Sequence, residues 1–142
     1  MKFLIGIFII FLLFSSVSEA LDVKDRRKVS LKKDEQTRIL VKYGAYKRLF
    51  TFRWTLYQNE GLVILRSYDK KVAQNILYLN SINQNFKLFL KAKGADNYNV
   101  PYFLVKFKEF NTKKHEAVFE IFLSDLQDQI RLKYLKKDEK VK

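Results

Sequence analysis

The fold is decided by residues 48–68, which read RLFTFRWTLYQNEGLVILRSY. In the first half of this stretch, large apolar residues alternate with a mixed set, and a period of two indicates a β-strand with one buried face. The face expected to be buried comprises Phe50, Phe52, Trp54 and Leu56. The face expected to point outward comprises Leu49, Thr51, Arg53, Thr55 and Tyr57.

The alternation is interrupted by Asn59, Glu60 and Gly61, and a second apolar run begins at Leu62. Gly61 can adopt the positive φ that a short hairpin loop demands, so we predict a β-hairpin that turns at this point. Large aromatic side chains provide the greatest burial available to a small domain. The hairpin therefore places Trp54, the single tryptophan of the chain, in the predicted core.

The first 20 residues have the layout of a secretory signal peptide. Lys2 precedes an apolar run at 3–14, and mainly small or polar residues follow up to Ala20, where we expect cleavage. The apolar run is shorter than the roughly 20 residues of a membrane-spanning helix. We expect the mature chain to be exported, either periplasmic or secreted, and soluble. The predicted parts are a signal-peptide helix at 1–20, a single domain at 21–135 and a charged, disordered tail at 136–142.

The composition is basic and lacks cysteine. There are 28 Lys and Arg residues against 15 Asp and Glu residues, which gives a formal net charge of +13. Loss of Lys2 and Glu19 with the signal peptide leaves 27 against 14, so the mature chain keeps the charge of +13. Such a charge favours attraction to anionic surfaces, although AT-rich coding would also enrich lysine. Without cysteine the chain can carry neither a disulfide framework nor a lipid on a cysteine thiol.

Further segments with an apolar period of two occur along the chain, separated by stretches rich in turn-forming residues. Residues 93–99, which include Gly94 and Asp96, form the longest expected loop, and Pro101 suits the start of a strand. A helix is the alternative structure for residues 72–79. The expected strands are 27–32, 39–43, 49–57, 62–65, 72–79, 86–92, 103–108, 117–123 and 130–134.

This series of strands predicts an all-β fold, either an antiparallel β-sandwich or a small β-barrel. We favour the sandwich because some strands are apolar on both sides, as where Val118 and Phe122 alternate with Phe119 and Ile121. A small ligand-holding barrel should show polar exteriors throughout. The number and length of the strands resemble an immunoglobulin-like architecture, although the Cys and Trp pattern of antibody domains is absent.

Residues suited to catalysis or metal binding form no recognisable constellation. His115, the single histidine, lies in an expected turn and has no second imidazole or cysteine as a co-ligand. No serine has a Gly-x-Ser-x-Gly context, and the scattered single glycines do not form a phosphate-binding loop. Carboxylates are available at Asp69, Glu109, Glu116 and Glu120, but no spacing pairs them. We therefore predict that the protein is not an enzyme and uses no cofactor or metal.

Three hypotheses of function remain. The first, which we favour, is an interaction module that holds another envelope protein through an edge strand or an exposed apolar face. The second is a binder of an anionic polymer such as lipopolysaccharide, acidic glycan or nucleic acid. The third is a lipocalin-like barrel that holds a small ligand. The polymer would meet outward cations at Arg53, Lys87, Lys91, Lys106, Lys108, Arg131 and Lys133, with Tyr57 and Phe89 as stacking surfaces.

From these hypotheses we predict a candidate binding surface. Arg53 and Arg66 flank the predicted core, and Asp69 follows in the polar segment expected after the hairpin. No pattern in the sequence indicates an oligomeric state. The candidate surface residues are Arg53, Tyr57, Arg66, Asp69, Lys87, Phe89, Lys106 and Lys108.

Overall fold

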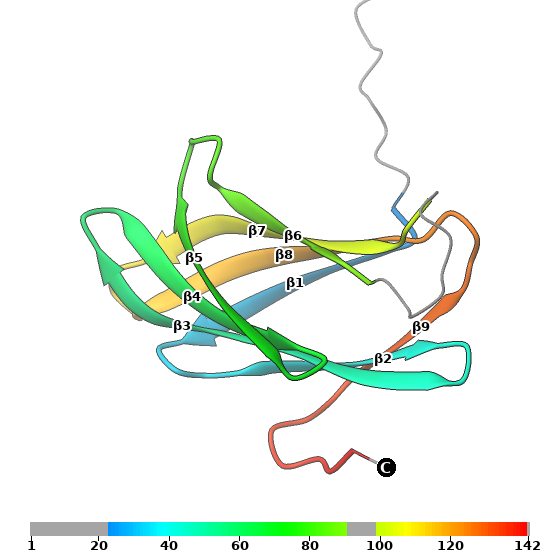
Figure 1. The fold of residues 1–142 in the computed structure, drawn as a ribbon. Coiled ribbons are helices and arrows are strands. Elements are labelled where there is room, and N and C mark those ends of the chain that lie inside the picture. The colour runs from blue at the N-terminus through cyan, green and yellow to red at the C-terminus, as the bar shows by residue number, and fades with distance from the viewer. Residues whose placement is uncertain (1–22, 91–98, 142) are drawn as a thin grey trace, which may run out of the picture.

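The computed structural model describes residues 23–90 and 99–141, which form nine β-strands and no helix (Figure 1). The predicted signal peptide and most of the predicted loop at 93–99 lie outside the described residues. In the described part of the chain, no helix is long and apolar enough to span a membrane. The strands are β1 (Asp25–Lys32), β2 (Thr37–Tyr43), β3 (Tyr46–Gln58), β4 (Gly61–Tyr68), β5 (Lys71–Tyr78), β6 (Asn85–Phe89), β7 (Tyr102–Asn111), β8 (Glu116–Ser124) and β9 (Ile130–Tyr134).

The strands form two antiparallel sheets that pack face to face. The smaller sheet has the order β1-β8-β7-β6, and the larger sheet has the order β5-β4-β3-β2-β9. Figure 1 shows the two layers, with the larger sheet twisted so that β5 rises toward β6. The predicted all-β, antiparallel, sandwich-like fold is confirmed, and the segment at 72–79 contributes strand β5 rather than a helix. Most consecutive strands are sheet neighbours, whereas immunoglobulin domains have Greek-key connections.

The core lies between the sheets and consists largely of phenylalanine rings. Phe50 stacks on Phe103 of the opposite sheet with ring centroids 5.1 Å apart, and Phe52 meets Phe119 edge to face at 5.3 Å. These contacts add to the stabilisation that comes from burying apolar surface. The predicted inward faces are confirmed by the burial of Phe50, Phe52, Trp54, Phe103, Val105, Phe107, Ala117, Phe119, Ile121 and Leu123.

A β-bulge in β3 overturns two expectations for the hairpin. The pairing of β3 with β4 shifts between Trp54 and Leu56, which leaves Thr55 as an extra residue in β3. The shift reverses the two faces beyond this point. Leu56 is 46% exposed, and Tyr57 stacks on Phe110 at the edge of the core with ring centroids 3.9 Å apart. The predictions of a buried Leu56 and an outward Tyr57 are therefore wrong.

The hairpin turn also differs from the prediction. Asn59 and Glu60 carry the positive φ angles, 53° and 65°, and form a two-residue loop. Gly61 has no positive φ and is the first residue of β4. A Cβ atom at this position would lie 3.0 Å from the ring of Tyr78. Gly61 therefore leaves room for the ring of Tyr78 and does not form the turn.

Strand β4 extends further than predicted. It ends at Tyr68, and Asp69 and Lys70, both with positive φ, form the turn to β5. The last three residues of β4 therefore belong to the sheet, although the sequence prediction places them in a polar connection. Arg66 pairs with Phe52, whose ring lies in the core, so Arg66 also faces the space between the sheets.

Candidate functional site

The two sheets separate along the seam between β5 and β6. Near the connection of these strands, the backbone N–H of Tyr78 donates to the carbonyl of Asn83 at 3.0 Å, and from there the strands diverge (Figure 1). A cavity of about 300 Å³ lies where the start of β5 faces the end of β6. Its walls include Arg48, Phe50, Arg66, Asp69, Lys71 and Phe89.

Arg66 lines this cavity from β4. Its Nε donates to Oδ1 of Asn75 at 2.8 Å, and its guanidinium carbon lies 4.9 Å from the centroid of the Phe86 ring. Burial lowers the pKa of the Arg66 guanidinium. Among the described residues no carboxylate forms an ion pair with Arg66. The seam cavity therefore holds a half-buried positive charge for which residues 23–90 and 99–141 supply no counter-ion.

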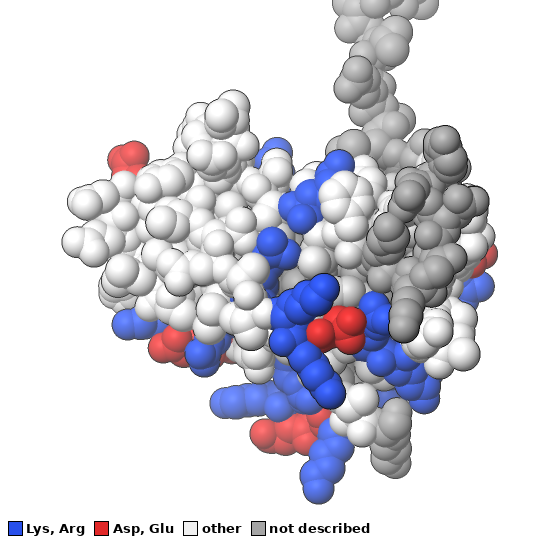
Figure 2. All heavy atoms as spheres, in the orientation of Figure 1, with Lys and Arg blue, Asp and Glu red and all other residues white. Residues whose placement is uncertain are grey.

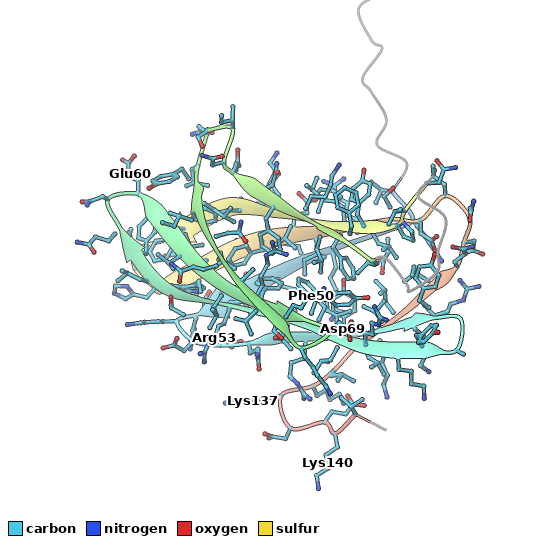
Figure 3. All side chains as sticks on the ribbon, viewed as in Figure 1. Phe50, Arg53, Glu60, Asp69, Lys137 and Lys140 are labelled. Carbon is cyan, nitrogen blue, oxygen red and sulfur yellow. The ribbon has the colours of Figure 1, made fainter. Side chains whose placement is uncertain are left out.

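The second arginine of the cavity wall has an ion-pair partner. Nη1 of Arg48 lies 3.3 Å from Oδ2 of Asp69, which is labelled in Figure 3 together with Phe50 of the same wall. Burial raises the pKa of the adjacent Tyr68 phenol, while the charge and hydrogen bond of Arg48 oppose this rise. With Arg66 and Lys71, the wall carries three cations and one carboxylate. Its local charge is positive.

Three residues predicted from the sequence, Arg66, Asp69 and Phe89, lie together on the wall of this cavity. Arg48 is absent from the sequence prediction. A signal for it exists in the alternation of β3, because Arg48 stands two residues before Phe50 and therefore on the same face of the strand. The third hypothesis expects a ligand inside a barrel, but phenylalanine rings fill the centre of this fold and the cavity lies at the seam.

The predicted cations outside this cavity are divided between the outer faces of the two sheets. Lys106 and Lys108 lie on β7 of the smaller sheet, whereas Arg53 lies on β3 of the larger sheet (Figure 3). On β6, Nζ of Lys87 lies 4.1 Å from the centroid of the Tyr102 ring. These cations do not form one continuous surface.

Two of the other cations predicted to point outward, Arg131 and Lys133, form ion pairs with acidic residues. Arg131 contacts Asp128 at 3.0 Å and Lys133 contacts Glu139 at 2.8 Å. Lys91 lies outside the described residues. Figure 2 shows most Lys and Arg side chains in the centre and lower part of the visible face, whereas its upper left, over the upper parts of β4 and β5, is largely uncharged.

Glu120 lies on the outer side of the smaller sheet, where it is buried beneath two cations. It forms a hydrogen-bonded ion pair with Arg26, and its Oε2 lies 3.6 Å from Nζ of Lys108. Burial raises the pKa of Glu120, but the hydrogen bonds and charges of Arg26 and Lys108 outweigh this effect and leave the pKa below its ordinary value. Lys108, predicted as part of a binding surface, therefore has a structural partner.

Replacing Glu120 with glutamine should make stability less dependent on pH in the acid range. The pKa of Glu120 in the folded chain lies below the ordinary 4.5, so the ionised carboxylate stabilises the fold above pH 4.5 and this contribution disappears as the pH falls through the folded-state pKa. Urea unfolding of both proteins at pH 7 and pH 3 measures the effect. We expect the parent to lose more unfolding free energy than Glu120→Gln, and equal losses would contradict the assignment.

The outer side of β3, β4 and β5 is an exposed apolar face. Val72 and Ile76 on β5 are 68% and 47% exposed. The register places Ile76 beside Val63 of β4, which in turn lies beside the exposed Leu56 of β3. Ile82, in the connection to β6, is almost fully exposed. Apolar side chains of three neighbouring strands and of the β5–β6 connection are therefore exposed on one face of the larger sheet.

The free edge of β5 adjoins this apolar face. The N–H of Tyr78 points away from β4, because it donates to Asn83 in the β5–β6 connection. Backbone groups alternate in direction along a strand, so the N–H and C=O groups of Val72, Gln74 and Ile76 also point away from β4. No strand among the described residues pairs with this edge of β5.

The carboxylates and the histidine considered for catalysis do not converge. His115 is an exposed turn residue with a φ of 51°, Asp69 pairs with Arg48, and Glu120 lies on the outside of the opposite sheet. The described ranges contain no group of three His, Cys, Asp or Glu side chains that could hold a metal ion. Comparisons of the chain with protein-family models, with curated proteins and with solved structures return no match.

Proposed function

We propose that this protein is an exported interaction module that binds an extended segment of a partner protein by strand addition to the free edge of β5. The observation that carries the proposal is the coincidence of unpaired backbone groups at Val72, Gln74 and Ile76 with the exposed apolar side chains of Val72 and Ile76. An added strand would form main-chain hydrogen bonds with this edge, and its side chains would extend the apolar face.

The other sheet edges are protected, which supports the assignment to β5. Natural proteins block exposed edges with charge, shortness or covering segments. β1 carries five charged residues, and β6 and β9 have five residues each. β5 has eight residues, no proline and a single charge, at Lys71. It is the sheet edge in the described structure that best fits an extended partner.

Export is part of the same proposal. The layout of residues 1–20 supports a signal peptide, and β1 begins at Asp25. Cleavage after Ala20 would therefore leave all nine described strands in the mature chain. The partner we expect is another protein of the cell envelope or of the extracellular space.

Replacing Gln74 with proline should weaken partner capture about tenfold, because proline removes an N–H that points to the free edge and obstructs an added strand. The substitution leaves the pairing of β5 with β4 in place, because proline is tolerated at strand edges. Gln74→Ala is the matched control and should bind like the parent. Capture is measured with tagged mature chain in envelope extract, and hydrogen exchange of the complex should show protected amides along β5. Capture that is unchanged by the proline, without protection of β5, would refute strand addition.

A polymer-binding function is the second candidate, and one feature favours it. An open groove lies between the β1–β2 connection and the C-terminal segment, and its basic residues are Arg27, Lys28, Lys32, Lys33, Arg38 and Lys137. Binding of a polyanion weakens steeply with salt because it releases counterions, whereas an apolar protein interface does not. Capture that persists at high salt and survives replacement of Lys28 and Lys33 of the groove by glutamine would support the protein partner. Loss at moderate salt would support the polymer.

A further inference from the structure

We propose that the seam cavity between β4, β5 and β6 binds a small amphipathic carboxylate. Its carboxylate would contact the guanidinium of Arg66, and its apolar part would lie against Phe50, Leu88 and Phe89. The proposal is independent of strand addition to β5, because it rests on the interior of the cavity and not on the free edge.

Arg66 has hydrogen-bond donors that the described part of the chain does not use. Its Nε is occupied by Asn75, and one face of its guanidinium lies over Phe86. The two terminal nitrogens donate to no acceptor among the described residues. These two nitrogens are accessible to solvent. Among the described residues, the single buried side-chain polar atom without a hydrogen-bond partner is Oδ1 of Asp125, so neither terminal nitrogen of Arg66 is both buried and unpaired. Free donors of arginine in a fork geometry match a carboxylate.

The lining of the cavity selects the rest of the ligand. Phe50 is fully buried, Leu88 is half-buried, and Phe89 is 57% exposed at the mouth. Ligand pockets have volumes of about 300–1,000 Å³, and this cavity of about 300 Å³ is at the lower end of that range. The ligand should therefore be small, such as a short aliphatic or aromatic acid.

The charges of the wall favour an anion over a neutral or cationic ligand. Arg48, Arg66 and Lys71 face the same space as one acid, Asp69, which Arg48 already contacts. A positive, partly enclosed wall raises the local concentration of anions. Because a hydrogen bond to Asn75 and the ring of Phe86 hold the guanidinium of Arg66 in the cavity wall, we assign the recognition of the carboxylate to Arg66.

The test is a calorimetric titration of the purified protein with octanoate, and octan-1-ol serves as the neutral probe. We expect saturable one-to-one binding of octanoate. Arg66→Met should weaken this binding about tenfold to a hundredfold, because a charged hydrogen-bonding partner is lost. Arg53→Met is the matched control, since it removes an arginine from the outer side of the same sheet, and should bind like the parent. Binding of octan-1-ol should be weaker than that of octanoate and insensitive to Arg66→Met.

A second variant keeps the test decisive if Arg66→Met does not fold. Ala73 lines the cavity from β5, so Ala73→Leu fills the space without removing a charge and should also abolish octanoate binding. Octanoate binding that is absent in the parent, that persists in Ala73→Leu, or that equals the binding of octan-1-ol would overturn the proposal. Equal weakening by Arg66→Met and Arg53→Met would also overturn it, because it would show attraction to net charge rather than recognition by Arg66.

Discussion

Replacing Trp54 with alanine should lower the free energy of unfolding by about 3–5 kcal/mol, the range found for large aromatic residues removed from a core. Trp54 is 3% exposed and meets Phe110 edge to face with ring centroids 5.5 Å apart. Its Nε1 donates to the carbonyl of Leu31 at 2.7 Å, which joins β3 of the larger sheet to β1 of the smaller sheet. The alanine variant therefore loses apolar burial, a ring contact and a hydrogen bond between the sheets. Domains are stable by about 5–15 kcal/mol, so this loss could unfold much of the population.

Two control variants separate the contributions of Trp54. Trp54→Phe retains most of the ring but loses the indole N–H, so its cost should be smaller and should report on the Leu31 carbonyl. Phe89→Ala removes an aromatic residue that is mostly exposed and should change stability little. Urea unfolding followed by circular dichroism measures all three variants. Similar midpoints for Trp54→Ala and Phe89→Ala would show that Trp54 does not hold the sheets together.

The regular parts of the fold follow from alternation, and the departures occur where alternation is ambiguous. In β7, buried apolar residues occur at every second position as far as Phe107, and Phe103, Val105 and Phe107 are buried as predicted. In β3, the residues around Leu56 and Tyr57 are apolar on both faces, so the sequence does not specify the register after Trp54. Packing of Tyr57 on Phe110 then fixes the bulge.

A second bulge lies in β7, and the sequence indicates it in a way that a strict period of two does not reveal. The pairing of β7 with β8 shifts between Phe107 and Glu109, so Lys108 is the extra residue. Two consecutive charged residues stand between Phe107 and Phe110, and a bulge lets both aromatic rings turn to the core while both charges stay outside. Doubled polar residues between apolar ones are therefore a usable indication of a bulge.

The candidate sites were less predictable than the core, because they depend on which strands remain unpaired. Sequence periodicity shows that Val72 and Ile76 share a face, but the free edge of β5 results from the divergence of β5 and β6. The seam cavity also results from the divergence of β5 and β6. Arg66 could be placed on the inward face through its spacing from Leu62 and Ile64, yet its lack of a counter-ion appears only when the neighbouring strands are in place.

Replacing Asp125 with alanine should lower the free energy of unfolding by about 3 kcal/mol. Its carboxylate is buried, and Oδ2 accepts hydrogen bonds from the backbone N–H of Ile130 at 2.7 Å and from Nζ of Lys24 at 3.0 Å. Nζ of Lys24 also donates to the carbonyl of Ile130 at 2.6 Å. This network holds the residue that precedes β1 against the connection between β8 and β9. Removal of Asp125 leaves a buried N–H without an acceptor and a lysine without its buried partner.

Two variants distinguish the buried interaction from general charge. Asp125→Asn keeps an oxygen for the Ile130 N–H and loses the charge that faces Lys24, so it should cost about half as much as the alanine variant. Asp128→Asn removes the charge of the exposed second acid that contacts Lys24, at 2.5 Å, keeps a residue type that tolerates the φ of 52° at this position, and should leave the unfolding free energy nearly unchanged. Denaturant unfolding at neutral pH compares the three. If Asp128→Asn cost as much as Asp125→Ala, the stabilisation would come from the charge around Lys24, and the buried acceptor for Ile130 would contribute nothing of its own.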